Sequence, residues 1–131
     1  MKTVAELKEE RQEKNSELFN KVGLFWAFSN EQFEEGKTPL KEGDKYVSIG
    51  MGGYLPKSNV EAFTSGLEEI KKWYNEEIKK NKAEKAEILY ELNNHECFYT
   101  HDISGVVSMF AGTYTEEEII AVFVKELKKA A

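Results

Sequence analysis

Apolar residues recur at steps of three and four along much of the chain, a spacing that predicts amphipathic helices. The clearest run extends from Val60 to Ile78 and follows a capping box formed by Ser58 and Glu61. Weaker versions of the pattern predict the remaining helices, over residues 3–22, 30–36, 86–94 and 103–112 and after a capping box at 115–118. Two more capping boxes, at 3–6 and 29–32, mark the starts of the first two of these helices.

Two short stretches have the pattern of strands rather than helices. The aromatic-rich run LFWAFS, residues 24–29, predicts a buried strand, and KYVSIGM, residues 45–51, alternates well enough for a second. We expect these two strands to pair with each other. The predicted fold class is therefore α+β, mostly helical, with about five helices and a small two-stranded sheet.

The chain of 131 residues is predicted to be a single domain, 1–131. An N-terminal helix, 1–22, precedes a globular body, 23–131. Between Leu7 and Leu18 this helix is almost entirely charged or polar. Its middle is expected to lie in solvent while its ends pack, or the helix is a protruding arm through which the chain forms homo-oligomers.

Composition narrows the class of protein. Apolar residues make up 40% of the chain and charged residues 32%, which predicts a packed core under a charged surface. The net charge of −6 argues against nonspecific binding of nucleic acid, and it permits docking on a basic partner. Cys97 is the single cysteine, so no disulfide can form within the chain. The charged N-terminus and the lack of a long apolar run predict a cytoplasmic protein with no membrane association.

The segment SIGMGGYLPKSNVEAF, residues 48–63, raises the question of an anion site. Gly52 and Gly53 let a ligand approach the backbone closely, while Lys57, Ser58 and Asn59 stand at a helix start, where free amides favour an anion. The segment matches neither the GxxxxGK[ST] loop nor the GxGxxG loop. The structural alternative is a tight bend in which the glycines supply positive φ angles.

The segment NNHECFYTHD, residues 93–102, holds both histidines and the only cysteine. Its spacing fits no common zinc module, and we predict no metal site. A Cys97–histidine nucleophile pair is conceivable, although a small buried thiol is the commoner outcome. Asn94, His95 and Glu96 are candidates for ligand binding, with capping of a helix end as the structural alternative. No catalytic residue and no cofactor is predicted, and enzymatic activity is left open with absence favoured.

Three segments, LFWAFSNEQFEEGK, EGDKYVSIGMGGYLPKSNVEAF and EILYELNNHECFYTHDI, resemble a family of small uncharacterised proteins of bacteriophages, prophages and other mobile elements. With the helix between them they cover roughly residues 22 to 125. The resemblance implies a bacterial host cell as the setting and implies no established chemistry. Within the shared segments, the residues expected to matter are Phe28, Ser29, Gln32, Phe33, Gly52, Gly53, Pro56, Lys57, Asn93, Asn94, His95 and Glu96.

Two functional hypotheses follow. The preferred one is a small acidic accessory protein of a phage or mobile element that binds a host protein or other macromolecule or a small anionic ligand, with counter-defence as a possible role. The alternative is a nucleotide-binding or nucleotide-processing protein that uses the 50–59 glycine-rich loop together with the 93–96 Asn-Asn-His-Glu segment.

Overall fold

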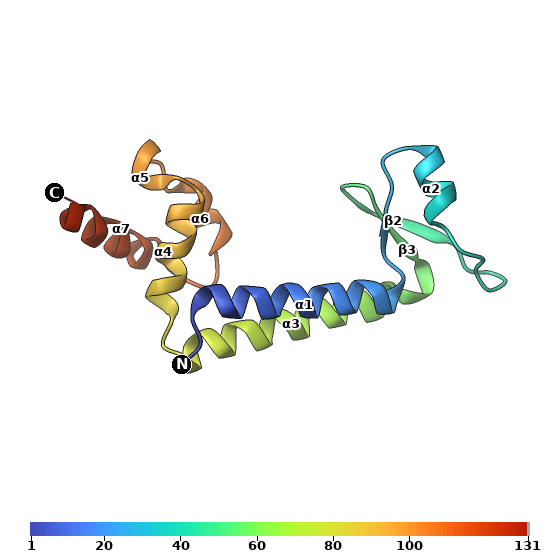
Figure 1. Cartoon of the computed structure of the whole chain (residues 1–131), viewed down its shortest axis with the longest axis horizontal. Coiled ribbons are helices and arrows are strands. Elements are labelled where there is room, and N and C mark those ends of the chain that lie inside the picture. Colours follow the sequence, from blue (N-terminus) through green and yellow to red (C-terminus); the bar gives the residue numbers. More distant parts are fainter. Residues whose placement is uncertain (131) are drawn as a thin grey trace. The chain divides into compact units, whose positions relative to one another are not determined.

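The structure, a computed structural model, describes residues 1–130 and shows an α+β protein that is mostly helical (Figure 1). The fold class is thus confirmed. In the described residues there are seven α-helices, a 3₁₀ turn and three strands. They are α1 (Val4–Val22), β1 (Phe25–Trp26), α2 (Asn30–Gly36), β2 (Tyr46–Gly50), β3 (Gly53–Pro56), the 3₁₀ turn η1 (Lys57–Asn59), α3 (Val60–Lys80), α4 (Glu84–Asn94), α5 (Cys97–Thr100), α6 (Ser104–Met109) and α7 (Glu116–Ala130).

The chain divides into two compact units. The first, the hairpin unit, comprises Lys8–Asn75. The second, the helical unit, comprises Met1–Leu7 and the described residues from Glu76 onward. The boundary falls inside α1 and α3, so that both helices contribute residues to both units.

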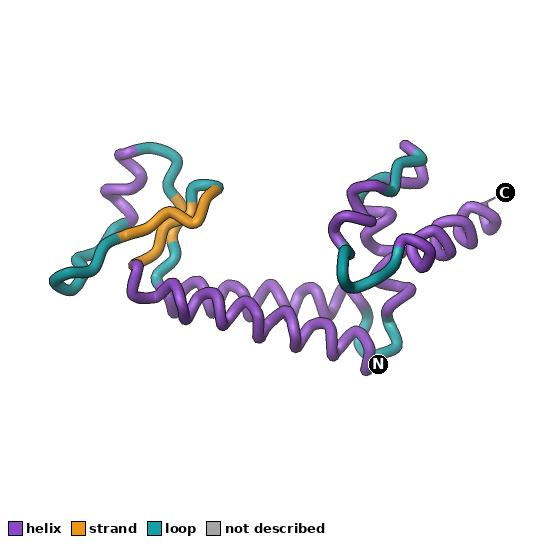
Figure 2. The backbone as a smooth tube through the Cα atoms, turned by 180° about the vertical axis from the view of Figure 1, so that it is seen from behind, coloured by secondary structure: helices purple, strands orange, loops and turns teal. Residues whose placement is uncertain are grey.

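In the hairpin unit, α1 and α3 run antiparallel and side by side (Figures 1 and 2). Near the sheet the contact is apolar, since the ring centroids of Phe19 and Phe63 lie 6.0 Å apart. Gly66 permits this close approach: a Cβ built on it would lie 2.5 Å from Cδ1 of Leu18.

The polar middle of α1 packs by a different contact. The guanidinium of Arg11 lies 4.2 Å from the ring centroid of Tyr74, and Nζ of Lys14 lies 4.6 Å from that of Trp73. Cations over aromatic faces are attracted by the ring quadrupole while their aliphatic stems cover the ring. These contacts explain how a helix with few apolar residues still packs along α3.

The sheet, whose strands are orange in Figure 2, has the strand order β1-β3-β2, and β3 is antiparallel to both neighbours. The prediction of a two-stranded sheet in which 24–29 pairs with 45–51 is therefore wrong in this detail. Met51 and Gly52 have positive φ angles of 53° and 83° and reverse the chain directly after β2. Because this tight turn brings residues 53–56 back along β2, the third strand lies between the two predicted ones.

Four aromatic side chains pack together on one face of the sheet, three from its strands and one from α2. Phe25, Phe33, Tyr46 and Tyr54 form ring pairs with centroids 5.0 to 5.9 Å apart, in tilted, edge-to-face and stacked arrangements. Helix α2 supplies Phe33 and begins with the predicted cap, in which Ser29 Oγ accepts a hydrogen bond from the Gln32 amide at 3.1 Å. The aromatic cluster thereby fixes α2 against β1.

The helical unit is built around α4. Helices α5, α6 and α7 contact it, and the core consists of Ile88, Leu92, Cys97, Val106, Phe110 and Ile119. The predicted short helix at 103–112 is observed as α6, with Val106 fully buried. The predicted capping boxes at Thr3 and Thr115 are confirmed, because each hydroxyl accepts a hydrogen bond at 3.2 Å from the amide of the glutamate three residues on.

Two carboxylates of α4 are buried with polar partners. Glu87 is 3% exposed and accepts a hydrogen bond of 2.7 Å from the hydroxyl of Tyr114. Glu91 is buried as well, and its Oε2 lies 3.5 Å from Nε2 of His95. Buried charged groups require polar partners, and the bond between Glu87 and Tyr114 joins α4 to the segment before α7.

Candidate functional site

The glycine-rich segment forms a β-hairpin rather than an open loop. Strand β2 ends at Gly50, the turn occupies Met51 and Gly52, and β3 begins at Gly53. The predicted sequence of strand, loop and helix is therefore replaced by strand, turn, strand and 3₁₀ turn. Gly52 and Gly53 belong to the hairpin, whereas Lys57, Ser58 and Asn59 form the 3₁₀ turn that follows it.

The 3₁₀ turn already holds a carboxylate of the same chain. The hydroxyl of Ser58 donates a 2.6 Å hydrogen bond to Oδ2 of Asp44, and the amide of Ser58 donates one of 3.2 Å to Oδ1. The hydroxyl bond is the main reason that the pKa of Asp44 is lowered. The side chain of Asn59 donates a 2.8 Å hydrogen bond to the carbonyl of Val22 at the end of α1. Ser58 and Asn59 thus have structural partners in positions where the sequence predicts an anion.

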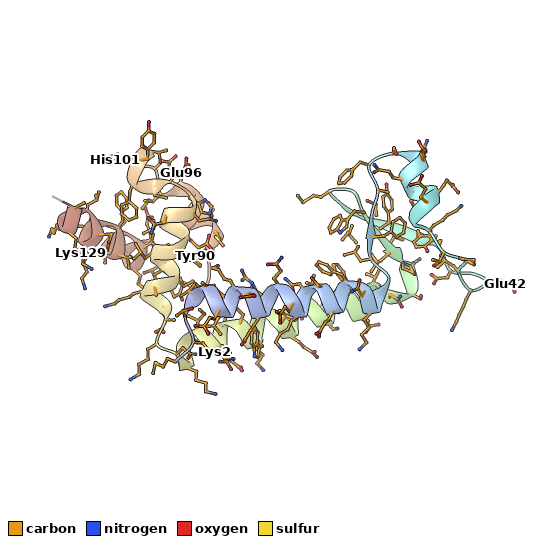
Figure 3. The ribbon with its side chains drawn as sticks, in the orientation of Figure 1. Lys2, Glu42, Tyr90, Glu96, His101 and Lys129 are labelled. Atoms are coloured by element: carbon orange, nitrogen blue, oxygen red, sulfur yellow. The ribbon has the colours of Figure 1, made fainter. Side chains whose placement is uncertain are left out.

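An open groove of about 1010 Å³ runs beside this turn. It is lined by Pro39, Leu40, Lys41, Glu42, Gly43, Asp44, Pro56, Lys57, Ser58, Asn59 and Glu61. Glu42 stands at the outer end of the loop that forms one wall (Figure 3). The groove includes Lys57 but neither Gly52 nor Gly53, so the predicted anion-binding residues divide between two places in the hairpin unit.

The Asn94–Glu96 segment lies in the helical unit, where it ends α4. The amide of His95 donates a 2.9 Å hydrogen bond to the carbonyl of Glu91. Glu96 and His101 adopt left-handed conformations, with φ angles of 56° and 61°, at the two ends of α5 (Figure 3). A depression of about 400 Å³ near this segment is lined by Asn93, Glu96, Phe98 and Tyr99. It includes Glu96 and no residue of the 50–59 segment.

Cys97 has the surroundings of a structural thiol. It is fully buried in the core, and burial raises its pKa, with the nearby Asp102 carboxylate as a second cause. A raised pKa keeps the thiol protonated and unreactive near neutral pH. Among the described residues, no group of three or more His, Cys, Asp or Glu side chains is placed to hold a metal ion.

The structure reveals a surface that the sequence analysis missed. Met51 is 92% exposed, Phe28 is 77%, Trp26 is 51% and Ile49 is 39%. We refer to these four residues as the hairpin patch. The run LFWAFS was expected to be buried, but β1 extends only over Phe25–Trp26, and the two strand residues point to opposite faces of the sheet. Phe25 enters the aromatic cluster, whereas Trp26 is left exposed.

The hairpin patch gathers around Gly52 in the turn and Gly53 at the start of β3. Trp26 is the cross-strand partner of Gly53. A Cβ built on Gly53 would lie 2.8 Å from Cγ1 of Ile49 and 3.0 Å from Cζ3 of Trp26, and one built on Gly52 would lie 2.4 Å from Cε1 of Phe28. The glycines therefore leave room for apolar side chains that lie flat against the backbone. Exposed apolar side chains that lie together, unlike ones scattered singly, are candidates for an interaction site.

These features define a mostly helical α+β protein whose small sheet presents an exposed apolar patch. None of its helices, within the part of the chain that the structure describes, is long and apolar enough to cross a membrane. The chain belongs to a family of unknown function, DUF7659, whose family model matches residues 7–130. This agrees with the expectation of an uncharacterised family. Comparison with curated proteins and with solved structures found no match.

Proposed function

We propose that this chain is a non-enzymatic binding protein that attaches to a partner protein through the hairpin patch. The observation that carries the proposal is the joint exposure of Trp26, Phe28 and Met51 around one hairpin turn. Tryptophan and other aromatic side chains are enriched among the residues that dominate binding energy in protein interfaces. The patch includes no charged residue, and such a surface fits apolar side chains of a protein better than phosphates of a nucleic acid.

The resemblance to proteins of bacteriophages and mobile elements supplies the biological setting of the proposal. In that setting the partner is a protein of the bacterial host, and counter-defence is one role that such a binder would serve. The geometry favours this surface over a nucleotide site in the 50–59 segment, because Ser58 donates both its hydroxyl and its amide to Asp44. A thermal-shift screen with nucleotides, repeated with Lys57→Ala, tests that alternative directly.

The experiment compares capture of host proteins by the immobilised wild-type chain and by two variants. Trp26→Ser/Phe28→Ser removes the two aromatic members of the patch. Tyr99→Ser is the matched control, because Tyr99 is 89% exposed and belongs to the helical unit. Circular dichroism establishes that all three proteins are folded to the same extent.

A partner identified by mass spectrometry is then titrated against each protein. Loss of two interface aromatics is expected to reduce the binding free energy by at least about 2 kcal/mol, which corresponds to a roughly 30-fold higher dissociation constant. The control is expected to bind as the wild type does. Equal binding by the folded Trp26→Ser/Phe28→Ser variant would remove the hairpin patch as the binding surface.

A further inference from the structure

Helix α7 presents a second apolar feature, in the helical unit and independent of the hairpin patch. Its inner side packs on the core through the fully buried Ile119 and through Phe123, whose ring stacks on Phe98 at 5.0 Å. On the outer side, Ile120 and Val124 are each 39% exposed. They are four residues apart and therefore adjacent on the helix surface.

Charged residues continue this row in both directions. Glu116 lies one turn before Ile120, and Lys128 lies one turn after Val124, so that the α7 stripe consists of Glu116, Ile120, Val124 and Lys128. Both charged residues are exposed, and no ion pair within the described residues engages either of them. By comparison, Nζ of the neighbouring Lys129, which Figure 3 labels, lies 3.6 Å from Oε2 of Glu126.

The α7 stripe is complementary to itself when it is reversed. Ile120 and Val124 are equidistant from Val122, and so are Glu116 and Lys128. Consider an antiparallel pair of α7 helices related by a two-fold axis that crosses the stripe at the level of Val122 along the helix. In this pair, Ile120 of each copy faces Val124 of the other. The same register places Glu116 of each copy opposite Lys128 of the other, which gives two ion pairs around an apolar centre.

The charges of α7 also disfavour a parallel arrangement of the two helices. A parallel pair would bring glutamates together at one end, where α7 begins with Glu116, Glu117 and Glu118, and lysines together at the other. Like charges in contact destabilise such a pair. Rows of residues four apart are the ridges used in the commonest class of helix packing, in which the axes cross at about −50°. We infer that two copies of this chain form a two-fold symmetric dimer through antiparallel contact of their α7 stripes.

The test measures the oligomeric state of the full chain by sedimentation equilibrium, over a range of concentrations and at low and high salt. The expected result for the wild type is a reversible monomer–dimer equilibrium. Ile120→Ser/Val124→Ser is expected to abolish the dimer while circular dichroism shows the helices intact. A chain that stays monomeric at every accessible concentration would overturn the inference.

A charge exchange identifies the interface. Glu116→Lys alone turns both ion pairs into lysine pairs, Lys128→Glu alone turns both into glutamate pairs, and each change is expected to weaken the dimer about tenfold at low salt. The combined variant restores opposite charges and is expected to return to within about twofold of the wild type. Any loss of helix stability would instead accumulate in the combined variant, since both changes oppose the α7 dipole. Failure of the combined variant to recover would exclude this register.

Glu9→Lys provides the matched control, because Glu9 is an exposed glutamate on α1, the helix from which the sequence predicts self-association. We expect this variant to dimerise as the wild type does and to show the same salt dependence. A dimer weakened by Glu9→Lys and unaffected by the α7 changes would assign the contact to α1 and refute the α7 dimer.

Discussion

Replacing Tyr114 with phenylalanine tests the buried hydrogen bond between α4 and the loop before α7. The Tyr114 hydroxyl donates to Oε1 of Glu87 at 2.7 Å, and Glu87 is 3% exposed. Among the described residues this hydroxyl is the one donor that contacts the Glu87 side chain. Phenylalanine preserves the ring, including its edge-to-face contact with Phe110 at 4.9 Å, and removes only the donor.

The size of the effect follows from the charge on the acceptor. Hydrogen bonds to charged groups contribute about 1.5 to 3 kcal/mol, and a buried carboxylate left without its donor also keeps its desolvation cost. We therefore expect Tyr114→Phe to lower the free energy of unfolding by about 2 kcal/mol. For a chain of this length, that loss corresponds to a decrease of about 7 °C in Tm.

Urea denaturation followed by circular dichroism measures the change, and a double-mutant cycle with Glu87→Met assigns it. Removing both polar groups should cost less than the sum of the two single changes, because the orphaned carboxylate disappears. Tyr99→Phe, on an exposed tyrosine, is the control and should be neutral. A loss below about 0.5 kcal/mol for Tyr114→Phe would refute a stabilising role for this bond.

Three further predictions concern other parts of the chain. Ser58→Ala should reduce the free energy of unfolding near pH 7, and its difference from the wild type should shrink near pH 2. The pKa of Asp44 is lowered mainly by the Ser58 hydroxyl, so the stabilisation from this bond is present above the ordinary carboxyl pKa and is lost as the pH falls through the lowered value. Denaturant titrations at both pH values measure the difference. Gly36→Ala should destabilise the chain by about 1 to 3 kcal/mol in urea denaturation. The added Cβ would lie 2.4 Å from a ring carbon of Phe25, and the aromatic cluster holds this ring in place. A gain in stability would contradict this. Cys97 should react with a disulfide reagent far more slowly in the folded chain than in denaturant, because the thiol is buried and its pKa is raised; comparable rates in a spectrophotometric assay would be inconsistent with that burial.

The helices could be predicted well from the sequence, because their physical determinants are local. The alternating spacing from Val60 to Ile78 lies within α3, and Thr3 and Thr115 cap helices where their neighbouring glutamates predict. The capping box predicted at Ser58 and Glu61 is not observed, because the hydroxyl and the amide of Ser58 donate hydrogen bonds to Asp44, which is distant in the sequence. Such competition from a non-local partner is invisible to a pattern of four residues.

The sheet and the exposed surface were harder to predict for the same reason. An apolar run as short as LFWAFS does not indicate which of its faces the rest of the chain will cover. The strand β3 was predicted to be part of a glycine-rich loop, because glycines precede and open it and suggested a ligand site or a tight bend. Its neighbours in the sheet come from segments on both sides. The period-two alternation of Phe25 and Trp26 was the available signal that one of the two points away from the aromatic cluster.

Replacing Gly53 with alanine tests how freely the side chains of the hairpin patch can move. A Cβ at Gly53 would approach Ile49 and Trp26 to 2.8 and 3.0 Å, much as one at Gly36 would approach Phe25. The difference is that Ile49 and Trp26 are exposed and can move, whereas Phe25 is held by other rings. Gly53→Ala should therefore leave the free energy of unfolding within about 0.5 kcal/mol of the wild type, because alanine is also less costly to order than glycine.

The same substitution should nevertheless alter the hairpin patch, because Trp26 can no longer lie against the backbone. In a Trp73→Phe background, in which Trp26 is the one remaining tryptophan, its fluorescence emission should shift, and binding of a partner captured through the patch should weaken. If Gly53→Ala instead destabilises the chain as much as Gly36→Ala does, then Trp26 and Ile49 are held as rigidly as a core. The glycines would in that case serve the stability of the hairpin rather than the shape of a binding surface.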